Sequence, residues 1–321
     1  MFVDPRTISR AEGCLLGQLA GDSLGSLVEF QSPSEIRRKY PDGVRELAAG
    51  GTWGTIAGQP TDDSEMALAL ARMLMKFRRY DADEARKAYL MWLNSSPFDC
   101  GATVASGLRG HLNRDSQANG ALMRISPLGI FCCNLDRYRT SEFAQMDAAL
   151  THPHPVCLQA NSLFTMAIAE AVSQGKSAQQ IYEDIKDWAV ARNVEKPLMK
   201  AILDAADGPP ADYLTQQGWV LIALQNALYQ LLHAKSLEEG IVNTVMCGGD
   251  TDTNAAISGA LLGAVYGREA LPKQWVEKVL NCRPMSGQAN VRHPRPECFW
   301  PVDALHIARC LVAGGEVRDR D

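Results

Sequence analysis

The sequence lacks the long apolar segments that place a chain in a membrane or send it out of the cell. It contains no uninterrupted apolar stretch of about 18 residues, the length that a bilayer-spanning helix needs. Its first residues, Met1–Arg6, lack the apolar region of a secretory signal. We therefore expect a soluble, cytoplasmic protein with no membrane partner.

The sequence also has little that would bind nucleic acid or zinc. The formal net charge is −5, and the short basic run at 37–39 lies beside Glu35, which predicts a solvated helix face rather than a nucleic-acid patch. Among only six histidines, His152 and His154 have no partner spaced to complete a tetrahedral zinc site. The nine cysteines are odd in number and form no C-x-x-C pair, so we expect reduced cysteines in the core.

Alternating strand patterns are nearly absent, whereas signals for helix starts occur throughout the chain. Capping boxes are found at Ser9 with Glu12, Asp81 with Glu84, Ser177 with Gln180 and Ser236 with Glu239. The proline and glycine breakers are too scattered to mark a linker, and 46% hydrophobic residues suffice for a large core. The pattern predicts an all-α fold, a single compact multi-helix domain over residues 1–321.

Two clusters of acids and hydroxyls each stand directly before an apolar run. Thr61–Ser64 precedes the run at 66–71, and Asp250–Thr253 precedes the run at 255–266. Ordinary helix capping explains one such residue per helix, but each cluster supplies three or four. Two such helices packed together would hold four carboxylates and two threonine hydroxyls around one point. Buried carboxylates that close need cations unless they share protons, and oxygen ligands select Mg²⁺, Mn²⁺ or Ca²⁺. We interpret the clusters as a two-metal site.

Four glycines recur at every fourth position between residues 13 and 25. On a helix they form one stripe without side chains, and each costs roughly 1 kcal/mol of helix stability relative to alanine. Close approach of another backbone is therefore expected along this stripe. The glycines do not account for Asp22 and Glu29, two acids seven residues apart in an otherwise apolar segment.

Five segments together resemble a known family. They are Gly21–Gly25 with Glu29, Thr61–Met66, Asn119–Arg124, Thr151–Pro155 and Gly248–Thr253. Their order is that of the ADP-ribosylglycohydrolases, and the chain most resembles the dinitrogenase reductase-activating glycohydrolase branch. The resemblance is clear from about residue 11 to about residue 270. The C-terminal part after about residue 275 receives no assignment.

The resemblance implies roles for individual residues. Two Mg²⁺ or Mn²⁺ ions would be held by Thr61, Asp62, Asp63, Asp250, Asp252 and Thr253. The catalytic acids would be Glu29, Asp63 and Asp99, with Glu29 close to the substrate ribose and Asp99 near the scissile linkage. Taken alone, Glu29 would be a surface acid at a helix end and Asp99 a helix cap.

The resemblance also implies that His152 contacts the ligand. Asn119 and Gly120 precede an apolar segment, so their N–H groups could meet a diphosphate or ribose at a helix start. A plain turn is the alternative for this pair.

The function expected from these residues is metal-dependent hydrolysis that removes ADP-ribose from modified protein, with arginine as the modified side chain. The partners would be an ADP-ribosylated protein and a cognate ADP-ribosyltransferase. Hydrolysis of a serine-linked or ester-linked ADP-ribose is the alternative within the enzyme class. A non-catalytic protein that binds ADP-ribose or a transferase is the alternative outside it.

Overall fold

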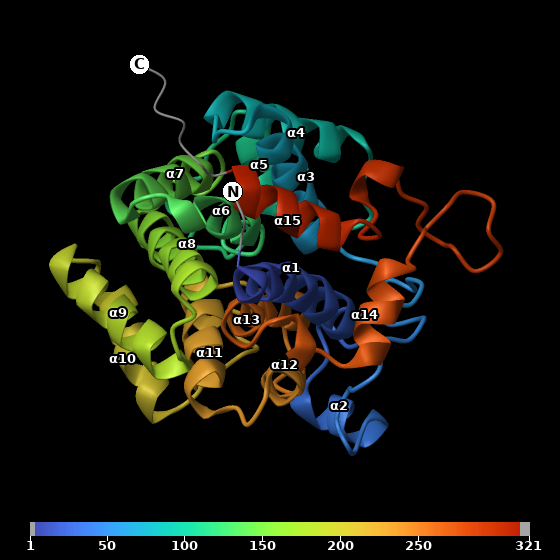
Figure 1. Ribbon diagram of the computed structural model, residues 1–321. Helices are drawn as coiled ribbons and strands as arrows, with labels where there is room; N and C mark the ends of the chain where they lie inside the picture. Colours follow the sequence, from blue (N-terminus) through green and yellow to red (C-terminus); the bar gives the residue numbers. More distant parts are fainter. Residues whose placement is uncertain (1–3, 315–321) are drawn as a thin grey trace.

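The computed structural model describes residues 4–314, which form helices joined by loops (Figure 1). Within that range there are fifteen α-helices and no β-strand, so the all-α prediction is confirmed. The α-helices are α1 (Pro5–Gly25), α2 (Pro33–Lys39), α3 (Asp62–Phe77), α4 (Ala82–Asn94), α5 (Ala102–Leu108), α6 (Ser126–Phe131), α7 (Arg137–Ala149), α8 (Pro155–Gln174), α9 (Ala178–Ala191), α10 (Lys196–Asp207), α11 (Val220–His233), α12 (Leu237–Val245), α13 (Thr251–Tyr266), α14 (Lys273–Leu280) and α15 (Ala304–Gly314). Three short 3-10 helices are η1 (Cys132–Asn134), η2 (Arg268–Ala270) and η3 (Glu297–Phe299).

Most of the predicted helix starts are confirmed. Asp81, Ser177 and Ser236 cap α4, α9 and α12 by accepting hydrogen bonds from backbone N–H groups of the first turn. The start predicted at Ser9 is wrong. The helix begins one turn earlier, because Asp4 caps it and Pro5 occupies its first position, where a missing N–H costs nothing.

The glycine stripe of α1 packs against small residues of α13. A Cβ added to Gly17 would lie 2.2 Å from the carbonyl oxygen of Gly259, and one added to Gly13 would lie 2.5 Å from that of Gly263. At the other end, a Cβ on Gly25 would lie 2.4 Å from the Cα of Asp252. The predicted close approach is confirmed, and the pairing shows that the two helices are antiparallel. The C-terminal end of α1 therefore meets the N-terminal end of α13.

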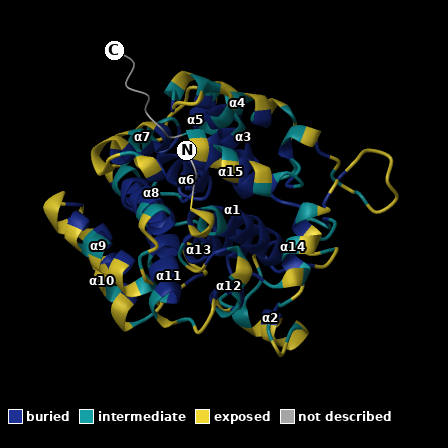
Figure 2. Cartoon of the chain, viewed as in Figure 1, coloured by how far each residue is buried: buried dark blue, intermediate teal, exposed yellow. Residues whose placement is uncertain are grey.

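These two helices form the centre of the molecule (Figure 1). Residues 11–25 of α1 and 251–264 of α13 are all buried. Helices α3, α6, α8, α14 and α15 contact α1, whereas α8, α11 and α12 contact α13. Figure 2 shows burial concentrated in these inner helices, while α9 and α10 expose their outer faces. A helix that is apolar on every side is stable in water only when it is covered in this way.

Helix α8 is long and apolar enough to cross a membrane by those two criteria. Its most apolar window is 78% buried inside the protein, however, as in the core helix of a globular fold. The basic run at 37–39 lies exposed at the end of α2, as predicted for a solvated helix face.

The nine cysteines are unpaired, in line with the reduced state that we expected. Five of them are buried, whereas Cys100, Cys247, Cys298 and Cys310 are only partly buried. The prediction that the cysteines are core residues is therefore wrong for these four.

Candidate metal and substrate site

The first turn of α3 is held by a residue from α1. The side chain of Thr61, at the N-cap position, makes no capping bond. Instead the Asp22 carboxylate accepts hydrogen bonds from the N–H of Thr61 at 3.1 Å and from the N–H of Ser64 at 3.1 Å. It also accepts one from the Thr61 hydroxyl at 2.9 Å. Asp22 thus fixes the helix end that carries Asp62 and Asp63 to the end of α1.

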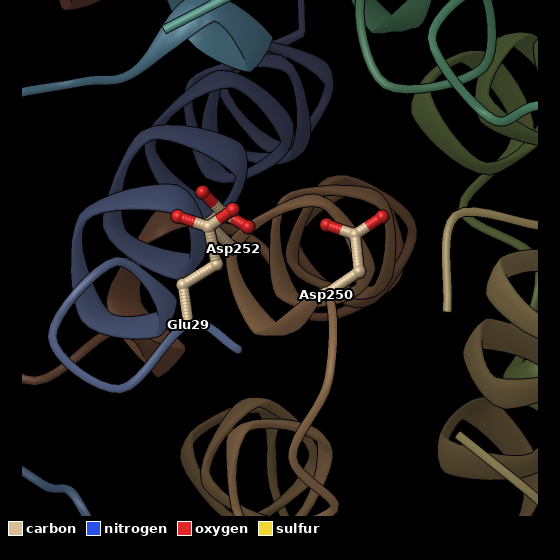
Figure 3. Close-up of side chains that lie close together, drawn as sticks. All are labelled: Glu29, Asp250 and Asp252. Atoms are coloured by element: carbon tan, nitrogen blue, oxygen red, sulfur yellow. The ribbon is translucent and has the colours of Figure 1, made fainter. Parts of the chain in front are cut away.

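Three helix ends therefore converge on one acidic cluster. Glu29 follows the end of α1, and Asp250 and Asp252 begin α13. One carboxylate oxygen from each of these three residues lies within 4.8 Å of the others, in the arrangement needed to hold a metal ion. Figure 3 shows the Glu29 and Asp252 carboxylates close together, with Asp250 entering from the start of α13. The sequence had assigned Glu29 to catalysis, but this geometry also places it among the possible metal ligands.

A cavity of about 260 Å³ brings the predicted residues together. Its lining includes Glu29, Asp62, Asp99, Asn119, Gly120, His152, Asp250, Asp252 and Thr253. Thr61 and Asp63 are buried behind this lining, and the Thr61 hydroxyl donates to Asp63 at 3.0 Å. The structure thus collects every site residue proposed from the sequence into one region, although their individual roles remain predictions.

The carboxylates of the cavity are strongly perturbed. Burial, and then the nearby charges of Asp99 and Asp250, raise the pKa of Glu29 to about 8. Burial raises the pKa of Asp62 and of Asp252 well above the usual range, and the neighbouring carboxylates add to this effect. In the described part of the chain, no lysine or arginine lines the cavity. The negative charge must therefore be balanced by bound protons or by cations.

The donor set fits a hard divalent cation. All the groups are carboxylate or hydroxyl oxygens, which Mg²⁺ and Mn²⁺ prefer. One oxygen of Asp63, Oδ1, is buried without a hydrogen-bond partner, as an oxygen reserved for an ion would be. The acidic cluster could accordingly bind a metal ion.

Asn119 lies in a turn, not at a helix start. Its backbone N–H donates to the carbonyl of Gly218 at 3.0 Å, so the N–H that we expected to face a ligand is already used. Its side-chain Nδ2 donates to Asp250 at 2.7 Å and holds that carboxylate. Gly120 is needed because a Cβ there would lie 2.8 Å from Val104 and 3.2 Å from the His152 ring.

His152 is fully buried and lines the same cavity. Arg124 donates to the Thr151 hydroxyl at 2.9 Å, and this hydroxyl lies 2.8 Å from His152 Nδ1. The Thr151 oxygen has a second lone pair besides the one that accepts from Arg124, so its contact with Nδ1 fits either tautomer of the neutral ring. Nε2 has no partner within the protein. Burial and the Arg124 charge lower the pKa of His152 to about 3, so the ring is neutral and its Nε2 is available to a ligand.

Sequence reasoning missed several residues of the site. The indole N–H of Trp53 donates to Glu29 at 2.6 Å, and Trp53 lies in an irregular loop with no motif to mark it. The exposed ring of Phe30 also lines the cavity, and its backbone adopts φ 65°. A non-glycine residue with positive φ leaves no recognisable pattern in a single sequence.

Fold and site together define a class, an all-helical protein whose helix ends gather buried carboxylates that could bind a metal ion. The family model of ADP-ribosylglycohydrolase matches residues 3–297. The chain therefore belongs to the ADP-ribosylglycohydrolase family, and the resemblance seen in its motifs is confirmed. The match also extends past residue 270, where the recognisable motifs end.

The chain is similar to several members of this family over most of its length. It is 31% identical to a putative ADP-ribosyl glycohydrolase of Acanthamoeba polyphaga mimivirus, over 91% of this chain and 96% of the relative. It is 29% identical to the ADP-ribosyl-[dinitrogen reductase] glycohydrolase of Rhodospirillum rubrum, over 86% and 92%. It is 24% identical to the ADP-ribosylarginine hydrolase Tri1 of Serratia proteamaculans, over 90% and 80%.

A solved structure described as an ADP-ribosylglycohydrolase-related protein complex superposes with a TM-score of 0.79. It covers 97% of this chain and 99% of its own, at 24% identity. At that identity the likeness establishes the fold alone.

Proposed function

We propose that this protein is a metal-dependent hydrolase that removes ADP-ribose from modified proteins, with arginine as the preferred linkage. The observation that carries the proposal is the cluster of four buried carboxylates and the partly buried Asp99 around a cavity that no lysine or arginine lines; the four are Glu29, Asp62, Asp250 and Asp252. Membership of a glycohydrolase family supplies the reaction class.

Cleavage at the anomeric carbon of ribose passes through an oxocarbenium-like state. The enzyme must stabilise that positive charge, orient the ribose hydroxyls, supply a water molecule and protonate the leaving group. Two Mg²⁺ or Mn²⁺ ions held by Thr61, Asp62, Asp63, Asp250, Asp252 and Thr253 would balance the carboxylates and activate water. The remaining tasks fall to the side chains around them.

Glu29 is suited to transfer a proton, either to the leaving group or from the attacking water molecule. Its raised pKa, about 8, lies near physiological pH, so both its acid and its base forms are accessible. The Trp53 indole donates to one carboxylate oxygen at 2.6 Å and fixes its direction. We assign Glu29 the role of general acid or base.

The cavity itself is smaller than the nucleotide it would accept. A neighbouring cavity of about 570 Å³ shares Ala118, Gln217 and Gly218 with it and extends to Trp219. We place the ribose beside the carboxylates, within reach of His152 Nε2, and the rest of the nucleotide in this second cavity.

The preference for arginine is supported by Asp99. Burial raises the pKa of Asp99 to about 6, and its carboxyl lies next to that of Asp62 at the cavity wall. A carboxylate there can orient a planar guanidinium by paired hydrogen bonds. The relative named as an ADP-ribosylarginine hydrolase also supports this preference. A cytoplasmic location, with a cognate ADP-ribosyltransferase acting on the same protein and no nucleic-acid or membrane partner, completes the proposal.

The test is release of ADP-ribose from arginine-, serine- and ester-linked substrates, each with and without a chelator. We expect turnover of the arginine linkage that disappears with chelation. Turnover of only a serine or ester linkage would contradict the arginine preference and leave the hydrolase proposal intact. Binding of ADP-ribose without release from any substrate would identify a non-catalytic binding protein.

A further inference from the structure

The segment His293–Arg295 lies far along the chain from the acidic motifs, yet it contacts the loops that carry the site. It belongs to the part after about residue 275 that had received no functional assignment. Arg295 is buried, and its backbone is fixed at both sides. Its backbone N–H donates to the carbonyl of Pro284 at 2.9 Å, and its carbonyl accepts from the Trp300 indole N–H at 2.8 Å.

The Arg295 guanidinium is bound to the first turn of α3. Its Nε and Nη2 each lie 2.8 Å from an oxygen of Glu65, whose side chain is also almost fully buried. The Trp92 indole N–H donates a further hydrogen bond to the Glu65 carboxylate at 2.9 Å. Glu65 follows Asp62 by three residues on the same helix turn. This forked ion pair therefore fixes Arg295 relative to Asp62 and Asp63.

The remaining N–H groups of Arg295 bind the loop that carries Asp99. They donate to the Ser95 carbonyl at 2.9 Å, the Ser95 hydroxyl at 2.7 Å and the Ser96 carbonyl at 3.3 Å. This loop connects α4 with α5, and Ser96 has a positive φ of 57°. One buried guanidinium thus joins the α3 end to the Asp99 loop.

His293, two residues earlier, binds the loop that holds Glu29. Its Nε2 lies 2.8 Å from the carbonyl of Trp53, the residue whose indole donates to Glu29. Its ring stacks on Phe98, the neighbour of Asp99, with centroids 4.6 Å apart. The segment therefore contacts the supports of Glu29, Asp62 and Asp99 at once.

We propose that Arg295, with His293, is a positioning residue that sets the separation of these three acids. The proposal rests on the proposed function, because positioning has a catalytic meaning only if the protein hydrolyses an ADP-ribosyl linkage. Arg295 acts through Glu65 and Ser95 and does not touch the substrate. Displacement of a reacting group by about 1 Å can cost on the order of a hundredfold in rate, so a shifted loop is enough to stop turnover.

Arg72 provides a matched control. It also ties α3 to the C-terminal segment, through the Cys298 carbonyl at 2.7 Å, the Trp300 carbonyl at 3.4 Å and an ion pair with Asp303 at 2.8 Å. These partners lie in no loop that carries a site acid. Loss of Arg72 should therefore weaken the same attachment without moving Asp99 or Trp53.

The experiment compares Arg295→Met with Arg72→Met in the full-length protein, measuring thermal stability, kcat and KM. We expect Arg295→Met to lower kcat by about tenfold or more at nearly unchanged KM, whereas Arg72→Met keeps kcat within about twofold. In a double-mutant cycle with Asp99→Asn, the two losses should be less than additive, because the part of the Arg295→Met effect that acts through Asp99 is then already absent. Equal kcat losses in the two arginine variants, or additive losses in the cycle, would overturn the proposal.

Removing Arg295 leaves Glu65 buried and unpaired, so the variant could unfold. In that case kcat is measured for Arg295→Lys, because lysine keeps the buried positive charge but cannot make the two-point contact with Glu65. Retention of kcat in a folded Arg295→Lys variant would count against the proposal as strongly as retention in Arg295→Met.

A second readout does not depend on activity. The indole N–H signal of Trp53, assigned with Trp53→Phe, reports the bond to Glu29 in ¹H–¹⁵N spectra. His293→Phe keeps the stack on Phe98 and loses the bond to the Trp53 carbonyl, so the signal should move, whereas Arg72→Met should leave it in place. If no substrate is hydrolysed but the signal moves as expected, the proposed function fails and the structural link stands. An unmoved signal in His293→Phe contradicts the link itself.

Discussion

The Asp22 carboxylate caps α3 by accepting the backbone N–H of Ser64 at 3.1 Å, across 42 residues of sequence. A local capping residue would fix the start of α3 only to its own loop. Asp22 instead fixes it to the end of α1, beside the point where α13 begins. The acidic site consequently has a rigid frame made of three helix ends.

Chelation is expected to abolish turnover, and added Mg²⁺ or Mn²⁺ is expected to restore it. The reason is that the four carboxylates among the six ligands can stay ionised together in a buried cavity only when cations balance their charge. ADP-ribose release before and after exhaustive metal removal is the measurement. Full turnover in the metal-free protein would refute the metal-dependent mechanism.

Asp252→Asn should abolish activity and at the same time stabilise the metal-free protein. Burial and four neighbouring carboxylates disfavour the charge of Asp252, so the amide removes repulsion from the folded state. We expect a melting temperature above wild type in chelator, no further rise on adding Mg²⁺, and turnover reduced by orders of magnitude.

Asp62→Ala should likewise lose turnover while staying folded. Asp187 is exposed, so Asp187→Asn, which makes the same charge change, should alter neither the melting temperature nor turnover. If Asp252→Asn stayed active, Asp252 would not be a metal ligand.

Gly17→Ala is expected to destabilise the protein even though alanine favours helices by about 1 kcal/mol over glycine. The new Cβ would lie 2.2 Å from the Gly259 carbonyl oxygen, and such overpacking costs about 1–3 kcal/mol or more. Gly208→Ala, which meets nothing within 4 Å, should change stability by less than about 0.5 kcal/mol. Chemical denaturation measures both. Equal stabilities would mean that α1 and α13 are not in backbone contact.

The pH dependence of stability should contain a contribution from His152. Its pKa is about 3 in the folded protein because burial disfavours the charged ring, whereas the unfolded value is about 6.5. The unfolded state takes up a proton first as pH falls below 6.5, so this contribution is present above that pH and is lost toward pH 3. The slope for one proton is about 1.4 kcal/mol per pH unit. His152→Gln should remove this slope between pH 6 and pH 5 in denaturation experiments, and an unchanged slope would contradict a buried neutral ring.

Asp99→Asn and Asp99→Ala should impair hydrolysis of the arginine linkage more than they impair binding of ADP-ribose. The carboxylate is expected to orient the guanidinium, which free ADP-ribose does not contain. Turnover of the arginine-linked substrate is compared with the affinity for free ADP-ribose from calorimetry. Equal losses in both would remove Asp99 from recognition of the leaving group.

Local patterns in the sequence were sufficient for the parts of the site that lie near helix starts. Asp62 and Asp250 could be placed there because acids and hydroxyls preceded apolar runs, and the spacing of Gly17 with its neighbours predicted a close backbone contact. Ser9 shows the limit of such patterns. Its capping box is genuine in sequence, but Asp4 and Pro5 offer a better start, so Ser9 lies inside the helix and donates to Glu269.

Contacts between distant segments could not be predicted in this way. Asp22 caps α3, Trp53 holds Glu29 and Arg295 binds Glu65 through side chains that no local period connects. The turn at Asn119 was misjudged for the same reason, since its N–H is taken by Gly218 from a loop 99 residues later. Such pairings depend on how the helices pack, and packing is the part of the fold that a single sequence reveals least.

The antiparallel contact of α1 with α13 also sets the order of events during synthesis. Asp22 leaves the ribosome 228 residues before Asp250, which takes roughly 10–45 s at ordinary translation rates. Throughout that time the glycine stripe of α1, with Gly13, Gly17 and Gly21, has no α13 to pack against. The acidic site therefore cannot assemble until the start of α13, with Asp250 and Asp252, has been synthesised.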